Sequence, residues 1–171
     1  MARTDTPHVK AHIICYDFDK NKDYTVAKIK VDDLAECNGK YLFYYKNIDQ
    51  GGGQLWKLNL SSRKRRKIDD YIAYIKYGDG RYLLGPVSGD VSPTPIYIMK
   101  KNGTGKKKIC KAIGANIYKK KVYYIKYCGN DKGKILAKVC SCDFNGKNKK
   151  NLTKKMYYND IPEKYKKIIC S

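Results

Sequence analysis

A run of polar residues near the start of the chain has the spacing of a calcium-binding loop. The oxygen-bearing side chains occupy alternate positions, at Asp17, Asp19, Asn21 and Asp23. Positions 1, 3, 5 and 7 of an EF-hand loop supply ligands in the same way. Lys22, however, stands where that loop needs glycine, and Lys28 stands where it needs a bidentate glutamate. The alternatives are a weak calcium site and a plain polar turn, and we expect the turn.

Few residues could support catalysis. The chain has two histidines and two glutamates, and it contains no GxSxG, HExxH or P-loop motif. The carboxylate pairs Asp32-Asp33 and Asp69-Asp70 could serve a hydrolase, but they fall in predicted D–A connections, and the start of a turn explains them better. We therefore expect a non-enzymatic protein with no cofactor, and a carboxylate-based hydrolase is the last alternative.

The seven cysteines are an odd number, so they cannot all pair within one chain, and they show no CxxC spacing. Cys140 and Cys142 form a lone CxC, whose side chains would point to one face of a strand. His8 and His12 are the two histidines that could complete a metal site, so structural zinc is not expected. Buried free thiols are the expected state.

A repeat organises the chain. Four eight-residue segments align, beginning at Ile13, Leu55, Ile96 and Val139, with steps of 42, 41 and 43 residues. A further aliphatic residue follows each segment at a constant distance: Val26, Ile68, Ile109 and Leu152. Such periodicity is typical of stacked structural repeats.

Each full repeat predicts four antiparallel strands, A to D. The expected A strands cover 31–37, 71–77 and 113–118, and the expected B strands cover 40–47, 81–86 and 122–127. The aligned segment is strand C, and strand D follows a polar turn, as at 108–110. These strands predict an all-β fold of four-stranded blades with a period of about 42 residues, similar to a β-propeller.

The blades are expected to form one repeat domain over 1–171. After a tail (1–12) come a half blade (13–30), blades at about 31–69, 70–111 and 112–153, and a second half blade (154–171). The last segment would supply strands at 155–159 and 166–170. Pairing of the two half blades would close a four-bladed ring, and the alternative is a fragment or open stack of a larger ring.

Two stretches resemble the YWTD-type, low-density-lipoprotein-receptor-like propeller repeat of bacterial proteins. Tyr44-Tyr45-Lys46-Asn47, followed by Leu55 to Leu60, matches the "YYxN" strand and the segment after it. Residues 96–109 match the family's "LYRINLDGSGKKKL" pattern, and 143–147 repeat part of it. The resemblance covers about residues 13–170 and implies a propeller with a binding role and no catalytic residues. Members of this family are often exported.

Positive charge is concentrated in one class of turn. The net charge is +21, and the A–B and C–D turns, which share one end of a blade, hold 21 of the 37 Lys and Arg residues. The B–C loops at the other end (47–54, 85–95 and 128–134) have a net charge of −1. One interpretation is a polyanion-binding face; the other is that exposed turns tolerate lysine. The candidate contacts are Arg63, Lys64, Arg65, Arg66, Lys67, Lys106, Lys107, Lys108, Lys119, Lys120 and Lys121.

The B–C loops suggest a second partner. The 85–95 loop is long and stiffened by prolines, and loops of this kind often carry function. Binding of a protein or peptide at this end is the first functional hypothesis, and binding of nucleic acid or acidic polysaccharide at the basic end is the second. No apolar run is long enough to span a membrane, and no signal peptide is visible, so a cytoplasmic location is the default expectation.

Overall fold

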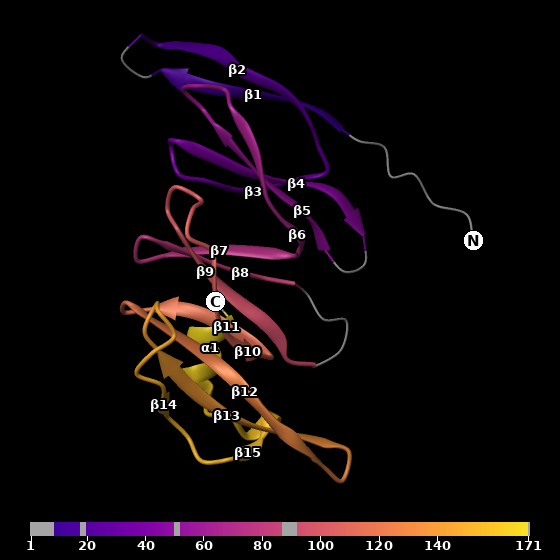
Figure 1. The fold of residues 1–171 in the computed structure, drawn as a ribbon, viewed down its shortest axis with the longest axis vertical. Coiled ribbons are helices and arrows are strands. Elements are labelled where there is room, and N and C mark those ends of the chain that lie inside the picture. Colours follow the sequence, from indigo (N-terminus) through magenta and orange to yellow (C-terminus); the bar gives the residue numbers. More distant parts are fainter. Residues whose placement is uncertain (1–8, 18–19, 50–51, 87–91, 171) are drawn as a thin grey trace, which may run out of the picture. The chain divides into compact units, whose positions relative to one another are not determined.

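The computed structural model describes residues 9–17, 20–49, 52–86 and 92–170 (Figure 1). The chain divides into two compact units, residues 1–71 and 72–171.

The first unit contains a two-stranded and a four-stranded antiparallel sheet. The two-stranded sheet pairs β1 (Val9–Asp17) with β2 (Lys22–Val31). The four-stranded sheet follows chain order: β3 (Asp33–Cys37), β4 (Tyr41–Asp49), β5 (Gly52–Asn59) and β6 (Arg65–Ile72).

The second unit contains two further sheets with the same order. The first comprises β7 (Tyr74–Gly78), β8 (Arg81–Gly85), β9 (Thr94–Lys100) and β10 (Lys107–Ala112). The second comprises β11 (Gly114–Tyr118), β12 (Lys121–Asp131), β13 (Lys134–Cys142) and β14 (Lys150–Asn151), and β15 (Met156–Tyr157) also pairs with β13. The predicted all-β, propeller-like fold of four-stranded antiparallel sheets is thus confirmed.

Apolar side chains on one face of β4 and β5 form a core cluster of the first unit. Leu42 and Tyr44 lie on one face of β4, where they pack with Leu58 of β5 and Val31 of β2. The pairing of Leu42 with Leu58 and of Tyr44 with Trp56 sets the register. Because side chains alternate between the two faces of a strand, a slip of one residue would turn this apolar set to the other face.

The two sheets of the second unit pack face to face. Leu83, Ile96 and Ile98 of one sheet form a buried cluster with Val122 and Tyr124 of the other. At Gly78 the approach is so close that an added Cβ would lie 2.9 Å from the Cβ and Cγ2 of Ile117. This glycine is therefore required for the contact between β7 and β11, the first strands of the two sheets.

The opposite face of the last sheet is covered by the C-terminal segment. After a single 3-10 turn (η1, Tyr158–Asp160), helix α1 (Glu163–Cys170) packs on β11 and β12. Ile161 and Ile169 are buried there against Ile125 and Val139. In the described residues, no helix is long and apolar enough to span a membrane.

The prediction of a strand at 166–170 is therefore wrong, and of the strand predicted at 155–159 only 156–157 are in strand conformation. β15 is a two-residue strand paired with β13, and 163–170 are helical. Ile161, Tyr165, Ile168 and Ile169 follow helical rather than alternate spacing, and Pro162 precedes the helix, where proline is favoured. The half blade predicted at 154–171 therefore does not supply the two strands expected of it.

Candidate binding sites at the two ends of the strands

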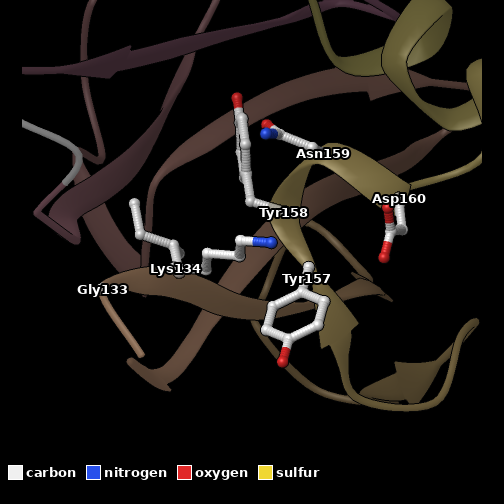
Figure 2. A pocket seen from close by; sticks show the side chains of 7 residues that line it. Gly133, Lys134, Tyr157, Tyr158, Asn159 and Asp160 are labelled. Atoms are coloured by element: carbon white, nitrogen blue, oxygen red, sulfur yellow. The ribbon is translucent and has the colours of Figure 1, made fainter. Parts of the chain in front are cut away.

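A cleft lies at the end of the β12–β13 hairpin, the B–C end of the last sheet. It has a volume of about 510 Å³. Figure 2 shows Lys134, Tyr157, Tyr158 and Asp160 around it. The remaining lining residues are Gly133, Ile135 and Asn159.

A tight turn and a short strand position these side chains. Lys132 and Gly133 have φ values of 47° and 75°, as a type I′ turn requires, and they connect the paired residues Asp131 and Lys134. On the other edge of β13, β15 pairs with Leu136 and Ala137 and so places Tyr157 beside the hairpin. The cleft is therefore built on strand pairing.

Polar contacts orient the side chains at the cleft. The Tyr157 hydroxyl donates a hydrogen bond of 2.7 Å to Asp131 Oδ2, and this bond, together with the nearby charge, raises the pKa of Tyr157. Lys134 Nζ lies 5.5 Å from the centroid of the Tyr157 ring, within the range of a cation–π contact. The cleft thus presents an ammonium group, a carboxylate from Asp160 and aromatic surface. None of its seven lining residues is His, Cys or Ser.

The first unit has a smaller cleft at its own B–C end, beside the β4–β5 hairpin. Its volume is about 340 Å³, and its lining includes Asn47, Gln54, Asp70 and Tyr71. Tyr71 is 65% exposed and has a positive φ of 56°. Both units therefore combine tyrosine, amide and carboxylate side chains at the hairpin end of the sheet.

The predicted B–C loops are shorter than expected. In the 47–54 segment, 47–49 and 52–54 belong to strands, and most of 128–134 extends the β12–β13 hairpin. The prediction of loops over these two segments is wrong because the strands continue past bulges in both hairpins. Residues 87–91 of the third loop lie outside the described residues.

The predicted polyanion contacts fall into two groups. Arg63 and Lys64 lie in the β5–β6 turn of the first unit, and Arg65 to Lys67 begin β6. There the Arg65 guanidinium donates a hydrogen bond to the Lys28 carbonyl, and Lys67 forms an ion pair with Asp70. The other group lies in the second unit: Lys106 precedes β10, Lys107 and Lys108 begin it, and Lys119 to Lys121 form the β11–β12 turn and the start of β12.

In the second unit, the structure brings the turns of neighbouring sheets together. The Lys120 N–H donates to Asp79 Oδ2 at 2.7 Å, which joins the two A–B turns. Lys107 Nζ donates to the Asn145 carbonyl at 3.2 Å, which joins the two C–D turns. Residues 163–167, which the repeat pattern predicts as a basic A–B turn in the last half blade, are helical instead. We call the four joined turns the basic end: 78–81, 100–108, 118–121 and 143–150.

A cleft at the basic end contains two cations, Arg81 and Lys100, that sequence reasoning did not single out. It has a volume of about 210 Å³, and Arg81, Lys100 and Lys107 line it together with Phe144 and Asn145. Arg81 and Lys100 are paired across β8 and β9. Arg81 begins a predicted B strand, whereas Lys100 lies inside the predicted C strand over 96–103, so no sequence signal placed Lys100 at this end.

The calcium candidate lies partly outside the described residues. Asp19 is not described, and neither is the side chain of Asp17. Asn21 occupies the β1–β2 turn with a φ of 49°. Within the described part of the chain, no group of three or more His, Cys, Asp or Glu side chains is arranged to bind a metal ion.

Cys140 and Cys142 lie in the core on one face of β13, as predicted, and they are free thiols, as are Cys37, Cys110 and Cys128. Burial raises the pKa of Cys142 to about 11 and that of the neighbouring Cys110 to about 12. At neutral pH these thiols are protonated and weakly nucleophilic. They act as packing residues.

Comparison with known proteins leaves the family open. No family model matches the chain, and no curated protein matches it. Among solved structures, a chain of a nidogen/laminin complex is 14% identical, with a TM-score of 0.42, over 89% of this chain and 60% of that one. A chain from a Saccharomyces cerevisiae complex of Dbp5 with Nup159, Gle1, IP6 and ADP is 8% identical, with a TM-score of 0.47, over 84% of this chain and 37% of that one. The protein thus spans less than two thirds of either chain, and likenesses at these levels say nothing about its function.

Proposed function

We propose that this chain is a non-enzymatic binding module of YWTD-type propeller repeats, and that it binds a peptide segment of a protein partner at the β12–β13 cleft. The observation that carries the proposal is a cleft of about 510 Å³ that combines Lys134, Asp160 and tyrosine surface. Its volume lies in the range of ligand sites, roughly 300–1,000 Å³. Tyrosine is enriched at protein interfaces because it offers a packed ring and a polar tip.

The chemistry of the cleft suits a peptide. A peptide carries backbone donors and acceptors together with side chains of either charge, and the cleft offers both an ammonium and a carboxylate. The Asp131–Tyr157 hydrogen bond holds one aromatic side chain in place before binding. Such preorganisation reduces the entropy lost when a ligand is bound.

Selection of random peptides displayed on phage against the full chain tests this proposal. Peptides retained by the chain are then measured by titration calorimetry against Asp160→Asn and Lys134→Gln. We expect either substitution to weaken binding by about tenfold, equivalent to about 1.4 kcal/mol. Lys154→Gln removes the same charge from an exposed position outside the cleft, and its affinity should equal that of the unchanged chain.

Enrichment of the same peptides by the Asp160→Asn/Lys134→Gln double variant would contradict the proposed site. Failure to enrich any peptide would contradict peptide binding itself. Circular dichroism of each variant confirms that the sheets are retained, so that loss of binding is not loss of fold.

A further inference from the structure

The basic end of the second unit has an unusually uniform charge. Its four turns contain twelve Lys and Arg residues and two acidic residues, Asp79 and Asp143, for a net charge of +10. Both carboxylates have partners within this end. Asp79 accepts from the Lys120 N–H, and Asp143 lies 3.9 Å from Lys121 Nζ and accepts from Asn148.

Tyrosines stand among these cations. Tyr77 and Tyr118 occupy equivalent repeat positions, each near the end of the first strand of its sheet, and they are 44% and 41% exposed. Lys101 Nζ lies 5.9 Å from the Tyr77 ring centroid, and Lys119 Nζ lies 5.3 Å from that of Tyr118. Each ring is thus accompanied by an ammonium group at the surface.

The rings are also supported from within each sheet. Tyr77 packs on Tyr82 with centroids 5.1 Å apart, and Tyr118 packs edge-on against Tyr123 at 5.9 Å. Since Tyr82 is fully buried, the Tyr77 ring has a fixed base. A supported aromatic ring loses little side-chain entropy when a ligand stacks on it.

Two of the lysines occupy strained backbone. Lys119 and Lys120 have φ values of 47° and 58°, where a type I′ turn strongly favours Asn-Gly. The left-handed conformation costs about 1–2 kcal/mol for each L residue. Strain of this kind collects at functional positions, and here it accompanies two charges at the tip of the turn.

From this arrangement we propose that the basic end binds single-stranded nucleic acid without sequence preference. Flexible single strands expose phosphates and unstacked bases together, and proteins bind them with a cationic surface that carries aromatic stacking platforms. The cleft of Arg81, Lys100 and Lys107 receives a phosphate, while Tyr77 and Tyr118 stack with bases. This role does not depend on the peptide cleft, which lies at the other end of the same strands.

Fluorescence anisotropy of a labelled oligothymidylate with the full chain tests the proposal. We expect binding to weaken steeply between about 50 and 200 mM salt. Lys119→Gln/Lys120→Gln should lower the slope of log K against log salt by about 1.4, since each single-strand phosphate contact contributes about 0.7. Lys154→Gln/Lys155→Gln removes two exposed charges outside the basic end and should leave the slope unchanged.

Tyrosine substitutions separate nucleic acid from other polyanions. Tyr77→Leu and Tyr118→Leu keep apolar volume but lose the flat ring, and each should weaken oligonucleotide binding about tenfold while heparin binding is retained. Tyr→Phe at the same positions should retain oligonucleotide affinity, which distinguishes stacking from loss of fold. Equal effects of Tyr→Leu on both ligands, or no effect on either, would overturn the nucleic-acid proposal. So would absence of oligonucleotide binding at low salt.

Discussion

Replacement of Tyr44 by phenylalanine should stabilise the first unit. Tyr44 is fully buried in β4, and among the described residues its hydroxyl has no hydrogen-bond partner. Burial raises the pKa of this phenol, against an opposing effect of Arg65. The hydroxyl is therefore removed from water without compensation.

The expected magnitude follows from the desolvation of one hydroxyl. A buried polar group without a partner destabilises the folded state by about 1–3 kcal/mol. Phenylalanine removes the oxygen but keeps the ring against Leu42, Leu58 and Val31. The small space left by the oxygen offsets part of the gain. We therefore expect Tyr44→Phe to raise the free energy of unfolding by about 1 kcal/mol.

The single tryptophan makes this measurable. Trp56 is the cross-strand partner of Tyr44 and packs on the same core, so its fluorescence reports unfolding of the first unit. With a denaturant dependence of about 1–3 kcal/mol per molar urea, the midpoint should rise by about 0.3–1 M. The dependence itself should not change, because the surface exposed on unfolding is nearly the same.

A lowered midpoint would refute this reasoning, since it would mean that the Tyr44 hydroxyl makes a favourable bond in the folded chain. Tyr157→Phe is the opposing control. The Tyr157 hydroxyl donates to Asp131 at 2.7 Å, so its removal should destabilise the β12–β13 hairpin. Amide exchange of the hairpin should accelerate in this variant while Trp56 fluorescence is unaffected.

Three further predictions concern the second unit. Ile169→Ala should weaken the packing of α1 on its sheet by about 2–4 kcal/mol, so amide exchange should be faster over 163–170 but not in β7–β10. If the variant and the unchanged chain exchange equally fast over 163–170, this side chain does not hold α1. Lys120→Gly should raise the melting temperature, by relief of about 1 kcal/mol of left-handed strain, whereas Lys121→Gly within β12 should lower it. Burial raises the pKa of Cys142 from 9.0 to about 11. The contribution of this protonated thiol to the free energy of unfolding is therefore fully present below pH 9 and is lost as pH rises through 11. Alkylation of Cys142 should be slow beside that of exposed Cys37. Alkylation of Cys142 as fast as that of Cys37 would contradict its burial.

The local pattern of aliphatic and turn residues was enough to predict the sheets. Aliphatic residues at Leu55, Ile96 and Val139 fall in β5, β9 and β13, and turn residues such as Asn-Gly and Asp-Gly separate the strands. These are short-range signals, which turn chemistry and strand alternation carry in the sequence itself. The two hairpins that run longer than predicted needed bulges, and a bulge is decided by pairing with the neighbouring strand.

The terminal helix shows how tertiary context decides a short segment. Ile168 and Ile169 after Tyr165 suit either a short strand or one face of a helix. The last sheet leaves Ile125 and Val139 on the face away from its neighbour, and an amphipathic helix covers that face with Ile161 and Ile169. The helical choice depends on a surface made by residues 125–139, which the local spacing does not contain.

The candidate sites, like the fold, depend partly on local sequence and partly on contacts between segments that are distant in the sequence. Strand order predicted that basic turns share one end, because A–B and C–D turns of an up-and-down sheet must do so. It did not predict that Arg81 and Lys100 flank a cleft, because that cleft is completed by residues of the neighbouring sheet's C–D turn, and the two sheets join through Asp79–Lys120 and Lys107–Asn145. The lysines beside Tyr77 and Tyr118, in contrast, belong to the same sheet as each ring. The repeat therefore gives each sheet similar basic turns, whereas a binding cleft made by several turns forms only where neighbouring sheets meet.

The variant Asp79→Ala should therefore loosen the junction between the sheets and weaken oligonucleotide binding, although it removes a negative charge. Tighter binding by that variant would show that charge alone, and not the joined geometry of the turns, governs the basic end.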